Sequence, residues 1–299
     1  MKSNAQVFVS VIIPVFNDAE RLKLCLDALD NQTYPQHLYE VIVVDNGSKE
    51  DIESVVTAFQ QTVFSQELRP GSYAARNQGI SLAKGEIIAF TDSDCIPATD
   101  WIEKGVFNLQ ATPNCGIIGG RIHTFFQDSD HPTPVELYDS VMAFPQKNYV
   151  EKDKFAVGAN LFTWKAILEK IGGFNEQMKS GGDYELGQRI AAAGYQIVYA
   201  ADTCVNHPAR YSFQEISKKI IRVIEGQYEF KDNEKITYNS QRFVKDLFKD
   251  LVPPIKFSVI IFQNKNLSFS QKLQVIYVRF YVKYLRAWAR GRHLLKLKT

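Results

Sequence analysis

Residues 87–97 read IIAFTDSDCIP, and this stretch decides the fold that the sequence predicts. Its first five residues, Ile87 to Thr91, form an apolar run with the length of a buried strand. Asp92 and Asp94 follow directly, with one serine between them. An ionised carboxylate is costly to remove from water unless a cation or hydrogen-bond donors meet it. We therefore expect a metal ion, a basic side chain or the water of an ordinary strand end beside these acids.

Two earlier apolar runs resemble this one, and helical segments separate them. VSVIIPVF (9–16) and YEVIVVD (39–45) predict strands, the second of which ends in Asp45. Helices are predicted at 18–31, at 51–60 and from within 70–80. Continuous apolar strands with helices between them predict an α/β fold with a mostly parallel sheet flanked by helices. Because ligands of such sheets bind outside the carboxyl ends of the strands, we expect Asp45 and Asp92 to face one crevice.

Composition places the chain among ordinary globular proteins. Its 299 residues allow one large or two modest domains, and 45% of them are hydrophobic and 23% charged. The four cysteines are scattered without a Cys-x-x-Cys pair, which favours a reduced, cytoplasmic protein without a zinc or redox site. The apolar run near the start lacks a cleavage site, and no run has the ~18 apolar residues of a spanning helix. We expect neither a signal peptide nor a transmembrane segment.

Known phosphate motifs narrow the chemistry. The chain contains neither G-x-x-x-x-G-K-[ST] nor a G-x-G-x-x-G after a strand, which argues against the common P-loop and dinucleotide sites. A pair of carboxylates at a strand end offers the oxygen ligands that Mg²⁺ and Mn²⁺ prefer. Such an ion would neutralise a diphosphate and stabilise it as a leaving group.

Six segments, in this order and spacing, resemble family 2 of the glycosyltransferases. They are VSVIIPVFND, VIVVDNGS, SYAARNQGI, AFTDSDCIP, GGFNE and GGDYELGQRI. The resemblance covers residues 8 to about 210. It implies the GT-A fold, a Rossmann-like α/β domain, and an inverting reaction with a nucleotide-diphospho-sugar, for which a UDP-sugar is the expected donor. We assign 1–210 to the catalytic domain and 211–299 to a helical, basic extension.

The resemblance identifies residues 92–94 with the family's Asp-x-Asp motif. It implies that Asp94 binds a Mn²⁺ or Mg²⁺ ion carrying the diphosphate. Asp92 would lie near the ribose and reach the ion through water, with Ser93 beside the nucleotide. Many relatives carry a histidine at the position of His207 that completes the metal site, and neutral imidazole suits Mn²⁺. The plain alternatives are solvated strand-end acids and a histidine of the core or surface.

The resemblance also implies contacts to the nucleotide. Asp45 would hold the base or the ribose, and the backbone around Pro14, Phe16 and Asn17 would line the base pocket. Ordinary packing at a strand end is the alternative for Pro14 and Phe16. Arg76, placed at the start of a predicted helix, would meet an anionic nucleotide together with free backbone amides. A surface salt bridge is the alternative for Arg76.

A second carboxylate site lies in GGDYELGQR (181–189). An inverting displacement needs a base that removes the proton of the acceptor hydroxyl, and a positioned carboxylate is the usual one. The resemblance assigns this role to Asp183, at the start of a helix, while a plain helix cap is the alternative. Relatives commonly carry a Glu-Asp pair here. Gly182 departs from it, which suggests a more flexible loop or a wider acceptor pocket.

The charge of the chain is divided unevenly. After Asp250 it has ten basic residues and no acidic one, which leaves 25 basic and 33 acidic residues before that point. From 270 onward one helical face carries four cations beside aromatic and aliphatic stripes. The four are Arg279, Lys283, Arg286 and Arg290. Such a helix resembles one that lies on anionic lipid. A helix packed on the catalytic domain with a solvated basic face is the alternative.

These patterns predict a metal-dependent glycosyltransferase that uses Mn²⁺ or Mg²⁺ to move a sugar from a nucleotide sugar to a saccharide or lipid-linked acceptor, in polysaccharide or glycolipid assembly. We expect a cytoplasmic protein, peripheral on the membrane through 270–298, and no nucleic-acid partner, because no recognition motif is present. The alternatives are a non-catalytic GT-A scaffold and a nucleotidyltransferase. The second would need an N-terminal Gly-rich loop with a basic residue, which PVFNDAE lacks.

Overall fold

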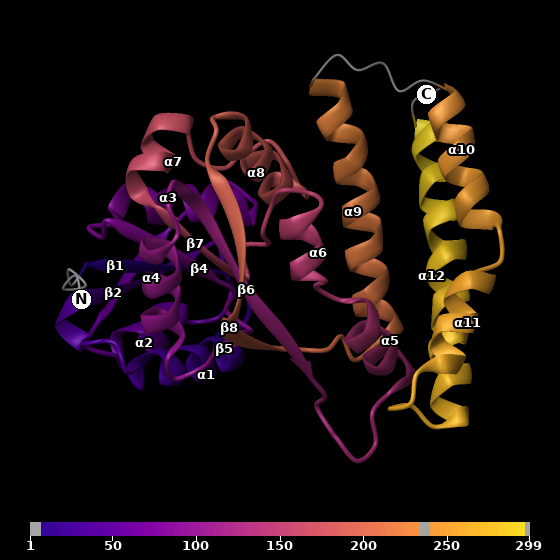
Figure 1. The fold of residues 1–299 in the computed structure, drawn as a ribbon, viewed down its shortest axis with the longest axis horizontal. Coiled ribbons are helices and arrows are strands. Elements are labelled where there is room, and N and C mark those ends of the chain that lie inside the picture. Colours follow the sequence, from indigo (N-terminus) through magenta and orange to yellow (C-terminus); the bar gives the residue numbers. More distant parts are fainter. Residues whose placement is uncertain (1–6, 234–239, 297–299) are drawn as a thin grey trace. The chain divides into compact units, whose positions relative to one another are not determined.

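The computed structural model describes residues 7–233 and 240–296, and Figure 1 shows the fold. The chain forms two compact units. The first, here the sheet unit, comprises the residues up to His123, Phe144–Gln177 and Gly182–His207. The second, the helical unit, comprises Thr124–Ala143, Met178–Gly181 and the chain from Pro208. The functional division at residue 210 stays a prediction, and the helical unit takes in two further segments from before that point, Thr124–Ala143 and Met178–Gly181.

Four parallel strands form the first half of the sheet, in the order β3-β2-β1-β4. They are β1 (Val9–Val15), β2 (Tyr39–Asp45), β3 (Thr62–Gln66) and β4 (Ile87–Thr91). Every residue of β1, β2 and β4 is buried, which explains their continuous apolar runs. Pro14 lies one residue before the end of β1 and beyond Ile12, the last residue paired with β4. Its missing N–H therefore interrupts no bond to β4.

The second half of the sheet contains antiparallel strand pairs. β4 pairs with β7 (Asn160–Trp164), and β7 pairs with β6 (Cys115–Phe125). The order continues with β8 (Gln196–Pro208) and ends at the two-residue strand β5 (Ile96–Pro97). The predicted α/β class, with a sheet flanked by helices, is confirmed. Parallel pairing joins β1, β2, β3 and β4.

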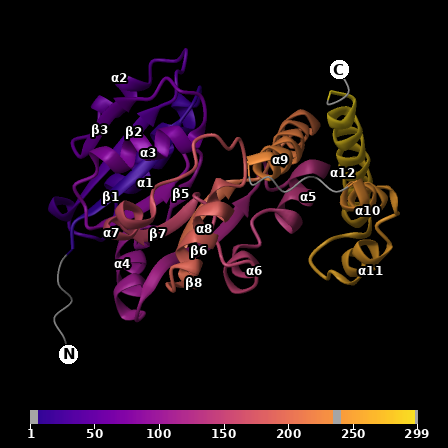
Figure 2. The ribbon, with the colours of Figure 1, turned by 90° about the horizontal axis from the view of Figure 1, so that it is seen from above.

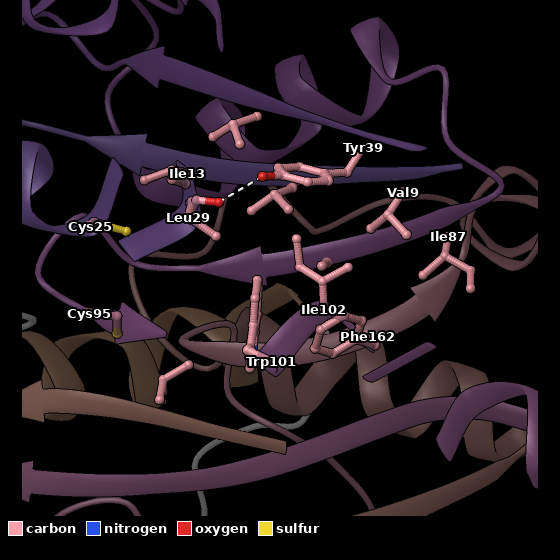
Figure 3. Close-up of a cluster of buried hydrophobic side chains, with 14 of the residues drawn as sticks. Val9, Ile13, Cys25, Leu29, Tyr39, Ile87, Cys95, Trp101, Ile102 and Phe162 are labelled. Atoms are coloured by element: carbon pink, nitrogen blue, oxygen red, sulfur yellow. Dashed lines mark hydrogen bonds between the residues drawn. The ribbon is translucent and has the colours of Figure 1, made fainter. Parts of the chain in front are cut away.

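Helices of the sheet unit pack on the strands through small residues. They are α1 (Ala19–Asp30), α2 (Ile52–Thr57), α3 (Ser72–Leu82), α4 (Trp101–Ala111), α6 (Gln146–Glu151), α7 (Lys165–Ile171) and α8 (Gly182–Ala192), with a 3₁₀ turn at Gln36–Leu38. A Cβ on Gly79 of α3 would come within 2.4 Å of the Ile12 side chain, so glycine lets this helix approach β1. Figure 3 shows the core beside β1, where the Tyr39 hydroxyl donates to the Leu29 carbonyl at 2.8 Å.

The helical unit has its own core. Its helices are α5 (Pro134–Met142), α9 (Phe213–Asn233), α10 (Ser240–Leu251), α11 (Ile255–Gln263) and α12 (Phe269–Lys296). Val275, Val278 and Val282 of α12 are buried against α5 and α9. α10 and α11 also contact α12, and the three helices lie side by side in Figures 1 and 2. Among the described residues, no helix has the length and hydropathy needed to cross a membrane.

Candidate active site

The carboxyl ends of the parallel strands bring the predicted acids to one edge of the sheet. Asp45 is the last residue of β2, and Asp92 directly follows β4. Asp45 is buried, and its Oδ1 accepts a hydrogen bond from the backbone N–H of Ser48 at 3.0 Å. The Asn-Gly-Ser turn after β2 therefore holds this carboxylate in place, as the short polar residues of a turn commonly do.

The loop after β1 is tied to the same turn. Asn17 has a positive φ of 49°, its N–H donates to Ser48 Oγ at 2.8 Å, and its Oδ1 accepts from the Lys49 N–H at 2.8 Å. These bonds hold the predicted base pocket at this edge. Phe16 projects from the loop with 61% of its surface exposed, whereas Pro14 is buried inside the strand. Of these two, Phe16 is the side chain that a ligand can reach.

Asp92 has a basic partner. Arg76 lies in the second turn of α3 rather than at its start, is buried, and donates from Nη2 to Asp92 Oδ1 at 2.5 Å. Its guanidinium carbon lies 5.9 Å from the ring centre of Tyr73 and 5.8 Å from that of Phe174. Burial lowers the pKa of Arg76, but the charges of Asp92 and Asp183 outweigh burial and raise it overall. The bond to Asp92 thus joins a buried arginine to a carboxylate that is 33% exposed, unlike the surface pair considered from sequence.

Asp94 and His207 come together as predicted, although 113 positions separate them in the chain. His207 Nε2 of β8 lies 3.6 Å from Asp94 Oδ1, and Arg21 Nη1 lies 3.8 Å from Oδ2. Burial raises the pKa of the Asp94 carboxyl, His207 lowers it, and the charge of Asp92 raises it further. The net effect is a raised pKa, which means that these contacts leave the negative charge of Asp94 undercompensated.

A third residue, Cys95, joins this cluster and was not predicted. Potential ligand atoms of Asp94, Cys95 and His207 all lie within 4.8 Å of one another. Burial raises the pKa of the Cys95 thiol well above its usual value, and the neighbouring aspartates raise it further. A thiol that stays protonated is a poor ligand, since the thiolate is the form that binds metals. The carboxylate and imidazole are the fitting donors, and they suit a hard divalent cation such as Mn²⁺.

Another acidic residue, Asp18, lies near Asp94. Ser93 Oγ donates to Asp18 Oδ2 at 3.2 Å, and Arg21 Nε donates to Asp18 Oδ1 at 2.7 Å. Asp18, Asp92 and Asp94 thus gather at the strand ends. Several carboxylates beside an imidazole offer the oxygen and nitrogen ligands that fit a divalent cation.

Asp183 stands in the first turn of α8, as predicted. Gly182, directly before it, is buried, and its N–H donates to the Tyr73 hydroxyl oxygen at 3.0 Å. A Cβ on Gly182 would come within 2.8 Å of the Tyr73 ring. The departure from the Glu-Asp pattern therefore makes room for a tyrosine. Instead of a loosened loop, the structure shows a packed contact.

Tyr73 connects the two carboxylate sites. Its ring stacks on Phe174, with centres 5.4 Å apart, and Arg76 lies over both rings. Burial raises the pKa of Tyr73, the charge of Asp183 raises it further, and Arg76 opposes both. Asp183 thus feels the same arginine that holds Asp92. The sequence offered no signal for this link, because Tyr73 and Gly182 are 109 residues apart.

Glu185 and Arg189, the next charged pair on α8, have a structural role. Arg189 Nε donates to Glu185 Oε1 at 2.6 Å, the intrahelical pair that their spacing predicts. The same guanidinium donates to the carbonyls that end α7, including that of Gly173 at 2.6 Å. The pair therefore joins α8 to the end of α7.

The basic stripe of α12 is bound within the helical unit. Arg286 and Arg290 donate to the two oxygens of Asp250 at 3.0 and 2.8 Å. Arg279 donates to the Tyr138 hydroxyl at 3.2 Å, and Lys283 donates to the Lys249 carbonyl. Arg290 is only 3% exposed. The sequence left open a helix packed on the catalytic domain with its basic face in solvent. In the structure the basic face is packed instead, against other helices of the helical unit.

Comparison with known proteins identifies the family of the chain. Residues 10–172 match Glycosyl transferase family 2, and residues 144–229 match Glycosyl transferase family 21. The chain is 40% identical over 225 residues to the glycosyltransferase AglE of Haloferax volcanii. The aligned region covers 74% of this chain and 73% of AglE. It is 22% identical over 228 residues to a dolichyl N-acetyl-alpha-D-glucosaminyl phosphate 3-beta-D-2,3-diacetamido-2,3-dideoxy-beta-D-glucuronosyltransferase of Methanococcus voltae, over 72% and 71% of the two chains.

A solved structure shares the fold. The mannosyltransferase PcManGT of Pyrobaculum calidifontis, in complex with GDP-Man and Mn²⁺, superposes with a TM-score of 0.59 at 20% identity. The match covers 97% of this chain and 74% of the other. The fold is GT-A, as the sequence predicted.

Proposed function

The chain belongs to glycosyl transferase family 2, and from this premise we propose that it is an inverting, metal-dependent enzyme that transfers a sugar from a nucleotide-diphospho-sugar to a hydroxyl acceptor. One observation carries the proposal. Undercompensated acid at the strand ends and a carboxylate at the start of α8 are joined through Arg76 and Tyr73. An inverting transfer needs both parts, a cation site for the leaving group and a base for the acceptor.

The loops after β1 and β2 would hold the nucleotide. The exposed ring of Phe16 would stack on the base beside Pro14 and Asn17, and Asp45 would accept from the base or ribose. Asp92 and Ser93 would lie along the ribose and diphosphate, with Arg76 supplying positive charge behind Asp92. We expect a UDP-sugar. The GDP-Man in the related structure makes GDP-sugars the first comparison.

Asp94 and His207 would hold the divalent ion, Mn²⁺ or Mg²⁺, with Asp92 reaching it through water. The raised pKa of Asp94 supports this assignment, because a cation would offset the negative charge that burial leaves undercompensated. The ion would supply positive charge to the departing diphosphate.

Asp183 would act on the acceptor. Its carboxylate would take the proton of the acceptor hydroxyl while that oxygen bonds to the anomeric carbon. The bond from the anomeric carbon to the diphosphate oxygen would break on the opposite face, and the diphosphate would leave with the electron pair. Tyr73 would position the base, because it accepts from the N–H of Gly182 beside it. The acceptor would be a saccharide or lipid-linked glycan in polysaccharide or glycolipid assembly at the cytoplasmic side.

Thermal shift of the purified protein tests the donor site. UDP-, GDP- and dTDP-sugars are added one by one, with Mn²⁺ or with EDTA. We expect one nucleotide class to raise the melting temperature, and only with the metal, because a ligand of the folded state stabilises by mass action. NMR of the product made from that donor should then show an inverted anomeric configuration. A folded sample that responds to none of them would contradict the proposal and favour a non-catalytic scaffold.

A further inference from the structure

The helical unit exposes a large apolar surface on α10, α11 and α12. In most soluble proteins, exposed large apolar side chains are scattered singly, and a contiguous surface of them marks an interaction site. Here they recur on α12 and on α10 and α11, the two helices that contact it along this side of the chain. We define the outer face by these residues: Val244, Phe248, Leu251, Val252, Ile255, Val259, Ile260, Phe262, Phe269 and Leu273.

Helical spacing organises the outer face. On α10, Val244, Phe248 and Leu251 follow i, i+4, i+7, while Leu247 and Asp250 point into the unit. On α11, Ile255, Val259 and Phe262 follow the same spacing opposite the buried Ile261. Phe248 and Ile255 are 67% and 68% exposed. Both helices thus direct large apolar side chains outward, with exposed lysines among them.

The outer face continues along α12. The rings of Phe262 and Phe269 lie 6.2 Å apart and join α11 to the first turn of α12. From Phe269 and Leu273 the exposed stripe runs on at helical spacing through Tyr277, Phe280, Tyr284 and Trp288. Tyrosine and tryptophan combine an apolar ring with a polar atom, and they are enriched where a membrane meets water.

The exposed charged residues among those of the outer face are lysines. Lys245, Lys249, Lys256 and Lys265 are exposed among its residues. Within the described side chains from Val244 to Arg292, the acids are Asp246 and Asp250, and both pair with cations of the unit. Protein–protein interfaces are poor in lysine. Apolar side chains rimmed by lysine instead suit an anionic lipid surface.

We propose that the outer face lies on an anionic lipid bilayer, with its apolar side chains inserted at the headgroup boundary and its lysines against the phosphates. The cations of the α12 stripe, being paired inside the unit, take no part. This inference deepens the proposed function, since it brings the enzyme to a membrane where lipid-linked acceptors are embedded. Vesicle binding can nevertheless be measured without donor or acceptor.

Cosedimentation with lipid vesicles tests the face. The full chain is spun with vesicles of phosphatidylcholine alone, and with vesicles that also contain phosphatidylglycerol. We expect binding to the second kind, weakened by salt. The double variant Phe248→Glu/Ile255→Glu should lower the partition coefficient by about tenfold or more. Replacing Lys245 or Lys256 with Gln should lower it by about fivefold on anionic vesicles and leave binding to neutral ones unchanged.

A control variant changes exposed apolar residues of the sheet unit. Leu24 and Phe107, on α1 and α4 of the sheet unit, are 50% and 51% exposed, and Leu24→Glu/Phe107→Glu should bind vesicles like the wild type. Circular dichroism and melting establish that each variant is folded. Wild type that stays in the supernatant, or an outer-face double variant that binds as before, would overturn the proposal. So would a wild-type dimer that the same variant dissociates, because the face would then be a protein interface.

The donor screen separates the two proposals. If vesicles bind and no nucleotide sugar stabilises the protein, the enzymatic proposal fails and the membrane surface stands. If a nucleotide sugar stabilises both the wild type and the outer-face double variant while neither binds vesicles, the membrane surface fails alone.

Discussion

The sheet unit and the helical unit each gather charge in one place, and the two clusters are satisfied differently. At the strand ends, His207 Nε2 and Arg21 Nη1 stand 3.6 and 3.8 Å from the carboxylate oxygens of Asp94. On α12, Arg290 and Arg286 donate to Asp250 at 2.8 and 3.0 Å. Asp94 keeps a raised pKa, whereas Asp250 shares its two oxygens between two arginines.

The difference between the two clusters shows when a charged motif in a sequence predicts a bound ligand. Both clusters were predicted to meet an outside partner, a metal in one case and anionic lipid in the other. Only the acids remain short of internal compensation. A charge cluster predicts a ligand when the chain itself does not supply the counter-charge, and this depends on residues far away in sequence.

The largest effect is expected at the base. Asp183→Asn should lower the transfer rate by about 10²- to 10⁴-fold, because the amide cannot take the acceptor proton. Nucleoside diphosphate release from the donor measures the rate, and metal-dependent thermal shift should show donor binding retained. Glu185→Gln is the matched control on the same helix, where the carboxylate pairs with Arg189, and it should keep most of the activity. Equal activity in Asp183→Asn would remove the residue from its assigned role.

The next effect concerns the basic stripe. Arg290→Gln should destabilise the helical unit by about 3 kcal/mol, because it leaves the buried charge of Asp250 with one arginine. Urea unfolding followed by circular dichroism measures the change. Arg292→Gln, two residues further along and exposed, should cost less than about 1 kcal/mol. If the two variants are equally stable, the stripe is not held inside the unit.

A glycine-to-alanine substitution is expected to destabilise the sheet unit and to stabilise the helical unit. Gly182→Ala should cost about 1–3 kcal/mol and lower activity, because its methyl group meets the Tyr73 ring at 2.8 Å. Gly291→Ala, on α12, meets nothing within 4 Å and should stabilise by about 1 kcal/mol. In a Tyr73→Ala background the cost of Gly182→Ala should largely disappear, as coupling between contacting residues predicts. A cost that persists there would mean that Tyr73 is not the obstacle.

The smallest effect is expected at the rim of the acid cluster. Arg21 is 53% exposed and pairs with Asp18 at 2.7 Å. Exposed pairs contribute little, so Arg21→Gln should change the free energy of unfolding by about 0.5 kcal/mol or less. Chemical unfolding without metal measures it. A loss of several kcal/mol would show that Arg21 already neutralises these acids, and the contrast with the helical unit would vanish.

Local pattern was enough to predict the parallel half of the sheet. The apolar runs ending at Asp45 and Asp92 are strands whose acids reach one edge, because a strand buried on both faces leaves a continuous pattern. The antiparallel pairing of β7 with β4 left no such trace, since an apolar run records burial and not direction. Similarly, Asp250 could not be matched to α12 from sequence, because its partners lie 36 and 40 residues away.

The site was predicted in part. Resemblance placed Asp94 and His207 together, and the structure brings them within 3.6 Å. Cys95 adjoins Asp94 in the quoted motif, but no Cys-x-x-Cys spacing marks it as a ligand in the sequence. Tyr73 carried no signal. Its place beside Asp183 depends on packing against Gly182, which only the folded chain creates.

Calorimetric titration of UDP and GDP into the wild type and Asp94→Asn, each with and without Mn²⁺, tests the central claim most directly. We expect one nucleotide to bind the wild type only when Mn²⁺ is present, and we expect Asp94→Asn to lose that binding. Binding that is equally strong without metal, or unchanged in Asp94→Asn, would show that the strand-end acids need no cation and would contradict the account.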